Sequence, residues 1–267
     1  LATSPPGHKT CSNPQQPLNI KPFRLDAQRW LPPPDCHHLP SPHYNERPDS
    51  QDISLCVLHN ISLPPLNFGS QYIDALFLGK LADERHIHPY FDDIADLRVS
   101  AHFFIARDGA ITQYVSTLKR AWHAGQSQYR GRENCNDFSL GIELNGADHI
   151  PYTLRQYQSC AQLITALHAR HPTFSLEHIT HHSHIAPQRK SDPGPAWRQN
   201  YLQYLLKQQH SPSSKNLLDC ALSFFIKTMA LSKRQFLKSA ALLAASPLIP
   251  ARAQIIMQSL LADLNAQ

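Results

Sequence analysis

Residues 53–59 read Ile-Ser-Leu-Cys-Val-Leu-His, and residues 138–144 read Phe-Ser-Leu-Gly-Ile-Glu-Leu. Each run is short, mainly apolar and partly β-branched, which is typical of a strand buried inside a sheet. The first run ends on the polar pair His59-Asn60, and the second carries Glu143 next to its last residue. We therefore predict two buried strands that each bring a polar side chain to a strand end.

A hairpin is predicted between these two runs. Residues 102–106 and 111–115 are both strand-like, and Asp108-Gly109 between them is a dipeptide that marks a tight turn. A further short strand is expected near Ile179.

Two helices are predicted in the second half of the chain. Thr153 and Gln156 form a capping box, after which apolar residues recur at helical spacing at Tyr157, Cys160, Ala161, Ile164 and Leu167. The second helix is expected over about 197–207. Strands interleaved with helices predict an α/β fold, in which one domain is built around a central sheet flanked by helices.

Composition sets the bounds of that domain. Half of the 22 prolines lie in residues 1–50, which predicts mostly extended or disordered chain there. Six of the 25 Lys and Arg but only two of the 20 Asp and Glu lie in 210–267, so this segment carries +4 of the formal charge of +5. The nearly neutral remainder argues against a nucleic-acid partner. We expect the folded unit at 23–209, an extension at 1–22 and a tail at 210–267.

Cysteine spacing and hydropathy describe a protein without a disulfide framework or a membrane span. The six Cys are scattered without a CxxC pair, as in a protein with reduced thiols. Residues 1–22 contain no basic region followed by an apolar run, so we do not expect a secretory signal there. No apolar stretch reaches the roughly 20 residues that cross a bilayer.

Three residues can assemble a metal site: His59 at a strand end, His182 after the strand near Ile179, and Asp192 ten residues later. Two imidazoles and one carboxylate suffice for catalytic Zn²⁺, because the fourth tetrahedral position stays open for water. Spacing alone leaves the alternative open, since the chain has 17 His and most His are surface or hydrogen-bonded residues.

The sequence around these positions resembles one family, the AmpD-type N-acetylmuramoyl-L-alanine amidases, which share a fold with peptidoglycan-recognition proteins. The resemblance spans about 23–209 and is carried by Leu58-His59-Asn60, Arg98-Val99-Ser100-Ala101-His102, Arg120-Ala121-Trp122-His123-Ala124-Gly125, 135–144 and 185–195. It implies a mixed central sheet flanked by helices and one zinc ion on His59, His182 and Asp192.

The same resemblance implies that Glu143 and Lys190 are the catalytic pair. A carboxylate can accept and deliver the proton of an attacking water, and a cation can stabilise the oxyanion that forms. It also implies substrate contacts, which are expected at Asn60, Arg98, Trp122, His123 and Arg189. Trp122 can equally be a plain core residue. Asn134, where the family often has Arg, and His184, where it often has Asp, are departures.

Residues 229–254 resemble a twin-arginine export signal, with Ser-Lys-Arg-Gln-Phe-Leu-Lys at 232–238, an apolar run and Ala-Arg-Ala at 251–253. Such a signal acts at an N-terminus. We interpret 210–267 as a linker and the start of a joined reading frame; the alternative is an amphipathic helix that packs on the domain or on a membrane.

The function that follows is cytoplasmic hydrolysis of 1,6-anhydro-N-acetylmuramyl peptides during peptidoglycan recycling. These muropeptides are the expected partners, with no nucleic acid and no stable membrane association of the catalytic domain. Two alternatives stay open, a non-catalytic muropeptide-binding module and a lytic amidase that acts on intact wall. Retention of all five residues, His59, His182, Asp192, Glu143 and Lys190, argues against the binding module.

Overall fold

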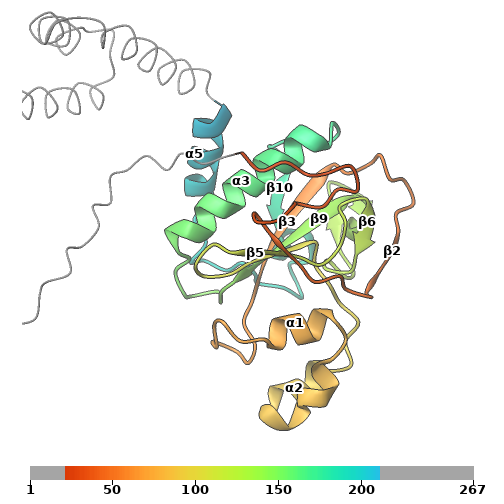
Figure 1. Ribbon diagram of the computed structural model, residues 1–267, viewed down its shortest axis with the longest axis vertical. Helices are drawn as coiled ribbons and strands as arrows, with labels where there is room; N and C mark the ends of the chain where they lie inside the picture. The colour runs from red at the N-terminus through yellow and green to blue at the C-terminus, as the bar shows by residue number, and fades with distance from the viewer. Residues whose placement is uncertain (1–21, 211–267) are drawn as a thin grey trace, which may run out of the picture. The chain divides into compact units, whose positions relative to one another are not determined.

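The two predicted buried strands lie side by side at the centre of a sheet. In the computed structural model, β3 (Leu55–Ile61) pairs in parallel with β9 (Ser139–Asn145) along the full length of both strands (Figure 1). Most of their side chains are buried, as expected for strands covered on both faces. The pair is therefore the framework on which the other strands and the candidate site are built.

Four more strands complete a six-stranded sheet in the order β1-β5-β4-β9-β3-β10. These strands are β1 (His37–His38), β4 (Phe103–Ile105), β5 (Ile111–Gln113) and β10 (Ile179–His181). All neighbours are parallel except β4 and β5, which form the predicted hairpin. Gly109 adopts a φ of +88° in its turn, which a glycine tolerates without strain. The predicted mixed central sheet is thus confirmed.

The structure describes residues 22–210, so the predictions for 1–22 and 210–267 fall, except at residues 22 and 210, outside the described residues. The chain divides into two units, 1–206 and 207–267, and the six-stranded sheet belongs to the first. Between residues 22 and 210, no helix has both the length and the apolar character needed to cross a membrane.

One face of the sheet is covered by α3 (Leu154–Arg170), the helix that was predicted from its capping box. The hydroxyl oxygen of Thr153 accepts from the backbone N–H of Gln156, and the Gln156 side chain accepts from the N–H of Thr153. The apolar face of α3 packs with β3, β9 and α5 (Gln199–His210) in the largest core cluster. This layer leaves the opposite face of the sheet for the site.

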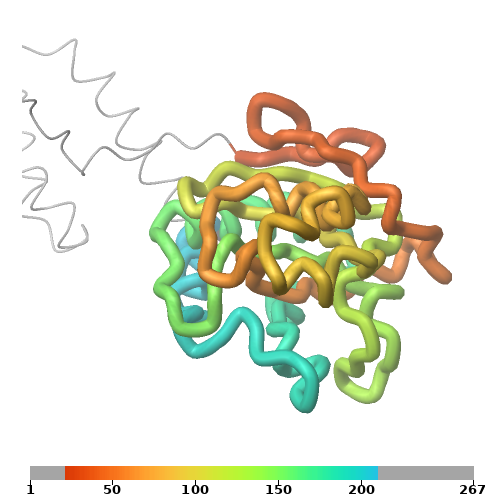
Figure 2. Tube along the Cα trace, turned by 90° about the horizontal axis from the view of Figure 1, so that it is seen from below, coloured from red at the N-terminus to blue at the C-terminus, as the bar shows by residue number. Residues whose placement is uncertain are grey.

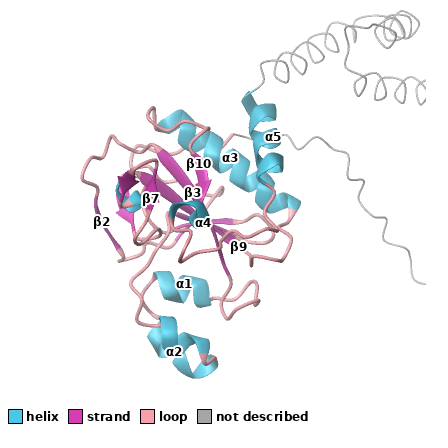
Figure 3. Cartoon of the chain, turned by 180° about the vertical axis from the view of Figure 1, so that it is seen from behind, coloured by secondary structure: helices cyan, strands magenta, loops and turns pink. Residues whose placement is uncertain are grey.

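The opposite face is partly covered by a segment that the sequence analysis did not predict as helical. It contains α1 (Tyr72–Phe77), the 3₁₀ helix η1 (Leu81–Ile87) and α2 (Tyr90–Ile94). Figures 2 and 3 show this segment on the side of the sheet away from α3 and α5. Its apolar side chains pack with Tyr114, Val115 and Ala121 in a second core cluster. Several residues of this cluster form one side of the cleft at the candidate active site.

Short elements connect these layers. β2 (Tyr44–Glu46) pairs with β6 (Lys119–Ala121), and β7 (Gln128–Tyr129) pairs with β8 (Arg132–Glu133). The 3₁₀ turn η2 (Cys135–Asp137) leads into β9, and α4 (His182–Ile185) follows β10 directly. Apart from β1 and β2, residues 22–50 form turns and irregular chain without a helix.

Candidate active site

Strand register brings two of the predicted metal ligands to the same edge of the sheet. His59 lies near the end of β3, and β10 runs parallel to β3 with His181 opposite Leu58. His182, the first residue of α4, therefore lies next to His59. Asp192 comes from the loop after α4, where its backbone carbonyl accepts from the N–H of Ser183 at 3.0 Å. The end of β3, the start of α4 and the loop after α4 therefore meet at one place.

The three side chains face each other closely enough to share an ion. Nδ1 of His59 lies 2.9 Å from Nδ1 of His182, and Oδ2 of Asp192 lies 3.2 Å and 3.1 Å from these two nitrogens. An ion held at about 2.0–2.2 Å in tetrahedral geometry keeps its ligand atoms roughly 3.3 Å apart. The donor set and its spacing therefore fit one small divalent cation. Among the described residues, no other set of three His, Cys, Asp or Glu side chains meets in this way.

Electrostatics keep His59 and Asp192 in the forms that bind metal. Burial lowers the pKa of His59 to about 4, so its imidazole is neutral at physiological pH. Burial raises the pKa of Asp192, but hydrogen bonds from His182 and His59 outweigh that effect and hold the pKa below its ordinary value. A neutral imidazole and an ionised carboxylate are the species that coordinate a cation.

Glu143 shares the face of the sheet that carries His59. The two residues are partners in the parallel register of β3 and β9, and paired positions in parallel strands project to the same side. Its Oε2 is buried, lines the cleft and has no hydrogen-bond partner among residues 22–210. Burial, followed by the charge of Asp192, raises the pKa of Glu143 well above its ordinary value. A carboxyl group in this state is suited to exchanging protons.

Lys190 lies at the rim of the same cleft. Its side chain is exposed, and its backbone N–H donates to the carbonyl of Ala186 at 3.0 Å. The ammonium is close enough to lower the pKa of Glu143, against the larger effect of burial. The loop that supplies Asp192 therefore also supplies a positive charge beside the candidate metal site.

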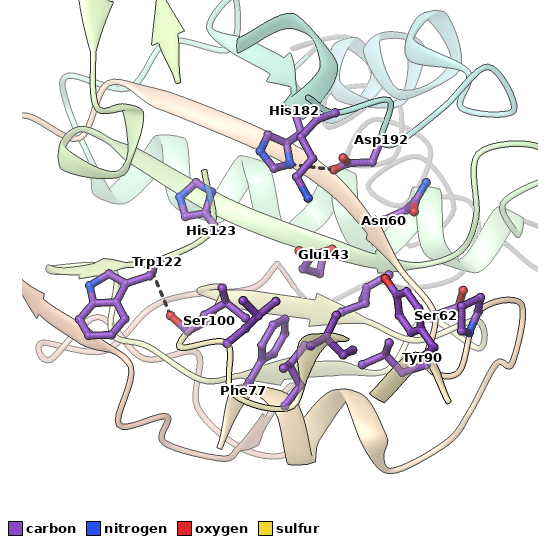
Figure 4. A pocket seen from close by; sticks show the side chains of 18 residues that line it. Asn60, Ser62, Phe77, Tyr90, Ser100, Trp122, His123, Glu143, His182 and Asp192 are labelled. Atoms are coloured by element: carbon purple, nitrogen blue, oxygen red, sulfur yellow. Dashed lines mark hydrogen bonds and ion pairs between the residues drawn. The ribbon is translucent and has the colours of Figure 1, made fainter. Parts of the chain in front are cut away.

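A cleft of about 330 Å³ joins these groups to the α1–α2 segment (Figure 4). One side is polar and carries His182, Asp192, Glu143 and Lys190. The other side is apolar and is formed by Leu63, Leu76, Phe77, Tyr90, Ile94, Leu97 and Val99. A ligand in the cleft would meet reactive groups on one side and an apolar surface on the other.

Three of the five predicted substrate contacts line this cleft. Asn60 donates to Oδ1 of Asp148 at 2.9 Å. Trp122 is half-buried, and its Nε1 donates to Oδ1 of Asn45 at 2.6 Å while its ring stacks on His43. His123 is buried, and both of its ring nitrogens have partners within the protein.

The two predicted arginine contacts lie elsewhere. Arg98 is exposed and is not among the residues that line the cleft. Arg189 also lies outside the lining, and its Nη2 donates to the carbonyls of Ala124 and Gln126 at 2.7 Å and 2.9 Å. The Arg189 guanidinium thus ties two loops together in this structure.

The apolar side of the cleft escaped the sequence analysis. Phe77, Tyr90 and Ile94 belong to helices of five or six residues, which are too short to show a helical repeat. The two departures from the family pattern are both exposed. Asn134 has a φ of +56°, a conformation that Asn tolerates better than most residues. His184 stacks on His181 outside the cleft lining.

Comparison with known proteins identifies close relatives. The sequence model of the N-acetylmuramoyl-L-alanine amidase family matches residues 49–195. The 1,6-anhydro-N-acetylmuramyl-L-alanine amidase AmpD of Citrobacter freundii is 55% identical over 168 residues, which cover 63% of this chain and 87% of that protein. AmpD of Escherichia coli K12 is 54% identical over 173 residues, covering 65% and 92%. A crystal structure of a selenomethionine AmpD derivative superposes with a TM-score of 0.65 and 52% identity, covering 68% and 98%.

Proposed function

Because this chain belongs to the N-acetylmuramoyl-L-alanine amidase family, we propose that its cleft hydrolyses the amide bond between 1,6-anhydro-N-acetylmuramic acid and L-alanine. The observation that carries this proposal is the meeting of His59, His182 and Asp192 beside Glu143, whose buried Oε2 has no hydrogen-bond partner among the described residues. The substrate follows from identity above 50% to enzymes named for that reaction.

Zinc is the proposed metal, held by Nδ1 of His59, Nδ1 of His182 and Oδ2 of Asp192. Two imidazole nitrogens and one carboxylate oxygen are a ligand set that zinc hydrolases use, and it leaves one position open. A bound Zn²⁺ would lower the pKa of water to about 7 and polarise the amide carbonyl.

Glu143 is the proposed proton carrier. Its carboxylate accepts a proton from the attacking water as the oxygen bonds to the carbonyl carbon. The same group then delivers that proton to the amide nitrogen as the C–N bond breaks, which gives a carboxylic acid and an amine. The acid then passes its proton to the amine, so the final products are a free carboxylate and an ammonium group. Its raised pKa favours the second transfer, because the group holds the proton until the leaving nitrogen takes it.

Lys190 is the proposed partner of Glu143. The carbonyl oxygen gains negative charge as water adds, and an ammonium at the rim of the cleft stabilises that charge more than it stabilises the neutral amide. Since Lys190 lies two residues from Asp192, one loop sets the position of both groups.

The apolar side of the cleft is proposed to bind the anhydro sugar. A sugar with a 1,6-anhydro bridge has fewer hydroxyl groups than an open muramic acid, and Phe77, Tyr90 and Val99 offer it apolar surface opposite the metal ligands. Asn60 and Trp122 remain proposed contacts at the two ends of the cleft. Arg98 and Arg189 remain proposed contacts for the peptide carboxylates, although each would first have to turn toward the cleft.

The proposal extends to the domain and its setting. We assign the amidase to 23–209, a range that contains every cleft residue, and regard 1–22 and 210–267 as separate from it. The setting is the cytoplasm, where small muropeptides are recycled, and fractionation of the native cells tests that part.

Incubation of the full chain with 1,6-anhydro-muropeptide and, separately, with intact sacculi tests the proposed function. Mass analysis should show anhydro sugar and free L-alanyl peptide from the first substrate at the higher rate. Faster release from sacculi would favour the lytic amidase instead. Binding of muropeptide without any turnover would favour the recognition module.

A further inference from the structure

A loop outside the proposed metal site contacts both of its imidazoles from behind. The Nε2 atom of His59 lies 2.9 Å from Nδ1 of His123, and Nε2 of His182 lies 3.2 Å from the carbonyl oxygen of Ala124. His123 and Ala124 are consecutive residues that follow β6. One dipeptide therefore provides an acceptor for the far nitrogen of each imidazole ligand.

When Nδ1 of His59 serves as a metal ligand, these contacts allow only one direction for each hydrogen bond behind it. Its Nδ1 faces Asp192 and His182, so a ligand role for this atom requires the ring proton on Nε2. That proton is donated to Nδ1 of His123, whose own proton must then lie on Nε2 and is donated to Oγ of Ser139 at 3.2 Å. The Ser139 hydroxyl donates to the carbonyl of Cys135 at 2.5 Å. This chain of hydrogen bonds ends on a backbone carbonyl, so His59 and His123 each have one consistent tautomer.

His182 is oriented in the same sense. Its Nδ1 faces Asp192, and its Nε2–H donates to the Ala124 carbonyl. The same oxygen also accepts from Nη2 of Arg189 at 2.7 Å. Because a backbone carbonyl only accepts, it selects the tautomer of His182 that leaves Nδ1 free.

The loop is itself rigidly held. Oδ1 of the buried Asn136 accepts from the backbone N–H groups of both His123 and Ala124, at 3.1 Å and 2.8 Å. The His123 ring lies against Gly141 of β9, where an added Cβ would come within 2.4 Å of the ring. Asn136 thus fixes the backbone of the dipeptide, and the glycine makes room for the His123 side chain.

We propose that His123 is a positioning residue, which holds His59 in the tautomer and orientation that bind the metal. Asn136 supports it and, through the Ala124 carbonyl, does the same for His182. The proposal rests on the proposed zinc site. It differs from a substrate contact at His123, because neither ring nitrogen of His123 is available to a ligand while these bonds are made.

Partners behind a metal ligand typically change metal affinity by about 10- to 100-fold. His123→Ala removes the acceptor from Nε2 of His59, so it should weaken Zn²⁺ binding by an amount in that range. His123→Asn places an amide oxygen where Nδ1 was, so it should bind Zn²⁺ several-fold more tightly than His123→Ala. His171→Ala is the matched control, since His171 is equally buried but bonds to Thr117 and does not line the cleft.

The test is a competition titration of the full chain with Zn²⁺ and a chromophoric chelator, with the melting temperature of the metal-free protein measured in parallel. We expect the parent and His171→Ala to bind Zn²⁺ most tightly, His123→Asn to bind it more weakly, and His123→Ala to bind it most weakly. Zinc affinity of His123→Ala within about twofold of the parent would overturn the positioning role, as would equal weakening in both His123 variants. His59→Ala, which lacks a proposed ligand, serves as the reference for a lost zinc site. A parent protein that binds Zn²⁺ no better than His59→Ala would refute the proposed zinc site and, with it, the positioning role of His123.

Discussion

Replacing Glu143 with Gln should separate catalysis from metal binding and from folding. Gln keeps the size and shape of the side chain but cannot accept a proton as a carboxylate does. Positioned proton transfer typically contributes about 10²- to 10⁴-fold to a rate, so kcat on anhydro-muropeptide should fall by that order. Zinc affinity should stay at the parent value, because none of the three proposed ligand atoms belongs to Glu143.

The same substitution should stabilise the metal-free protein at neutral pH. Burial raises the pKa of Glu143 in the folded state, so the unfolded chain releases this proton at lower pH than the folded chain does. Its contribution to stability is therefore present below the unfolded pKa of 4.5 and is lost as the pH rises toward the folded value. Gln does not ionise, so the variant avoids this loss.

The size of the effect follows from the burial of Oε2. A buried polar atom without a partner costs about 1–3 kcal/mol when neutral and more when charged, so replacing the carboxylate with the neutral amide should regain on the order of 1–3 kcal/mol. In a domain of this size, 1 kcal/mol shifts the melting temperature by about 2–4 °C. With chelator present, Glu143→Gln should thus melt about 2–12 °C above the parent at pH 7.5, with a smaller difference at pH 4.5. Parent-like turnover would refute the catalytic role, and a lower melting temperature at pH 7.5 would refute the electrostatic argument.

Four further outcomes are expected. Replacing any one of the three proposed ligands with Ala should abolish stoichiometric zinc and hydrolysis, and full zinc occupancy by elemental analysis in a variant would reject that ligand. Lys190→Ala should retain zinc but lose about 10²-fold or more in kcat, with partial recovery in Lys190→Arg; steady-state kinetics at the parent rate would contradict this. Burial holds the pKa of His171 at about 4 instead of 6.5, so the folded protein should lose up to about 3 kcal/mol as the pH falls from 6.5 to 4, and His171→Gln should show a shallower loss in urea titrations. A fragment of residues 23–209 should fold and hydrolyse anhydro-muropeptide as fast as the full chain; an insoluble or inactive fragment would show that the flanking segments contribute.

The centre of the fold was predictable because its sequence pattern is strong. The β3 and β9 runs are apolar over their whole length, and the capping box at Thr153 sets the start of α3. Their ends shifted by only one or two residues. Once β3 and β9 are parallel neighbours, the pairing of His59 with Glu143 follows from register.

The rest depends on tertiary context that a sequence pattern does not carry. The helices α1 and α2 are stabilised by the cluster beneath them rather than by a helical repeat of their own. The edge strands β1 and β10 have only two and three residues, so they are held in the sheet by pairing with β5 and β3 rather than by a strand pattern of their own. The contribution of Ala124 to the site is a backbone carbonyl, which any residue supplies, so only the folded structure could point to it.

Removal and return of the metal on the full chain would show whether hydrolysis depends on zinc. Product masses from 1,6-anhydro-muropeptide should be followed for the untreated protein, after chelation, and after addition of one equivalent of Zn²⁺. We expect anhydro sugar and free L-alanyl peptide in the first and third samples and intact substrate in the second. Unchanged hydrolysis after complete removal of the metal, or cleavage at any other bond, would contradict the proposed function.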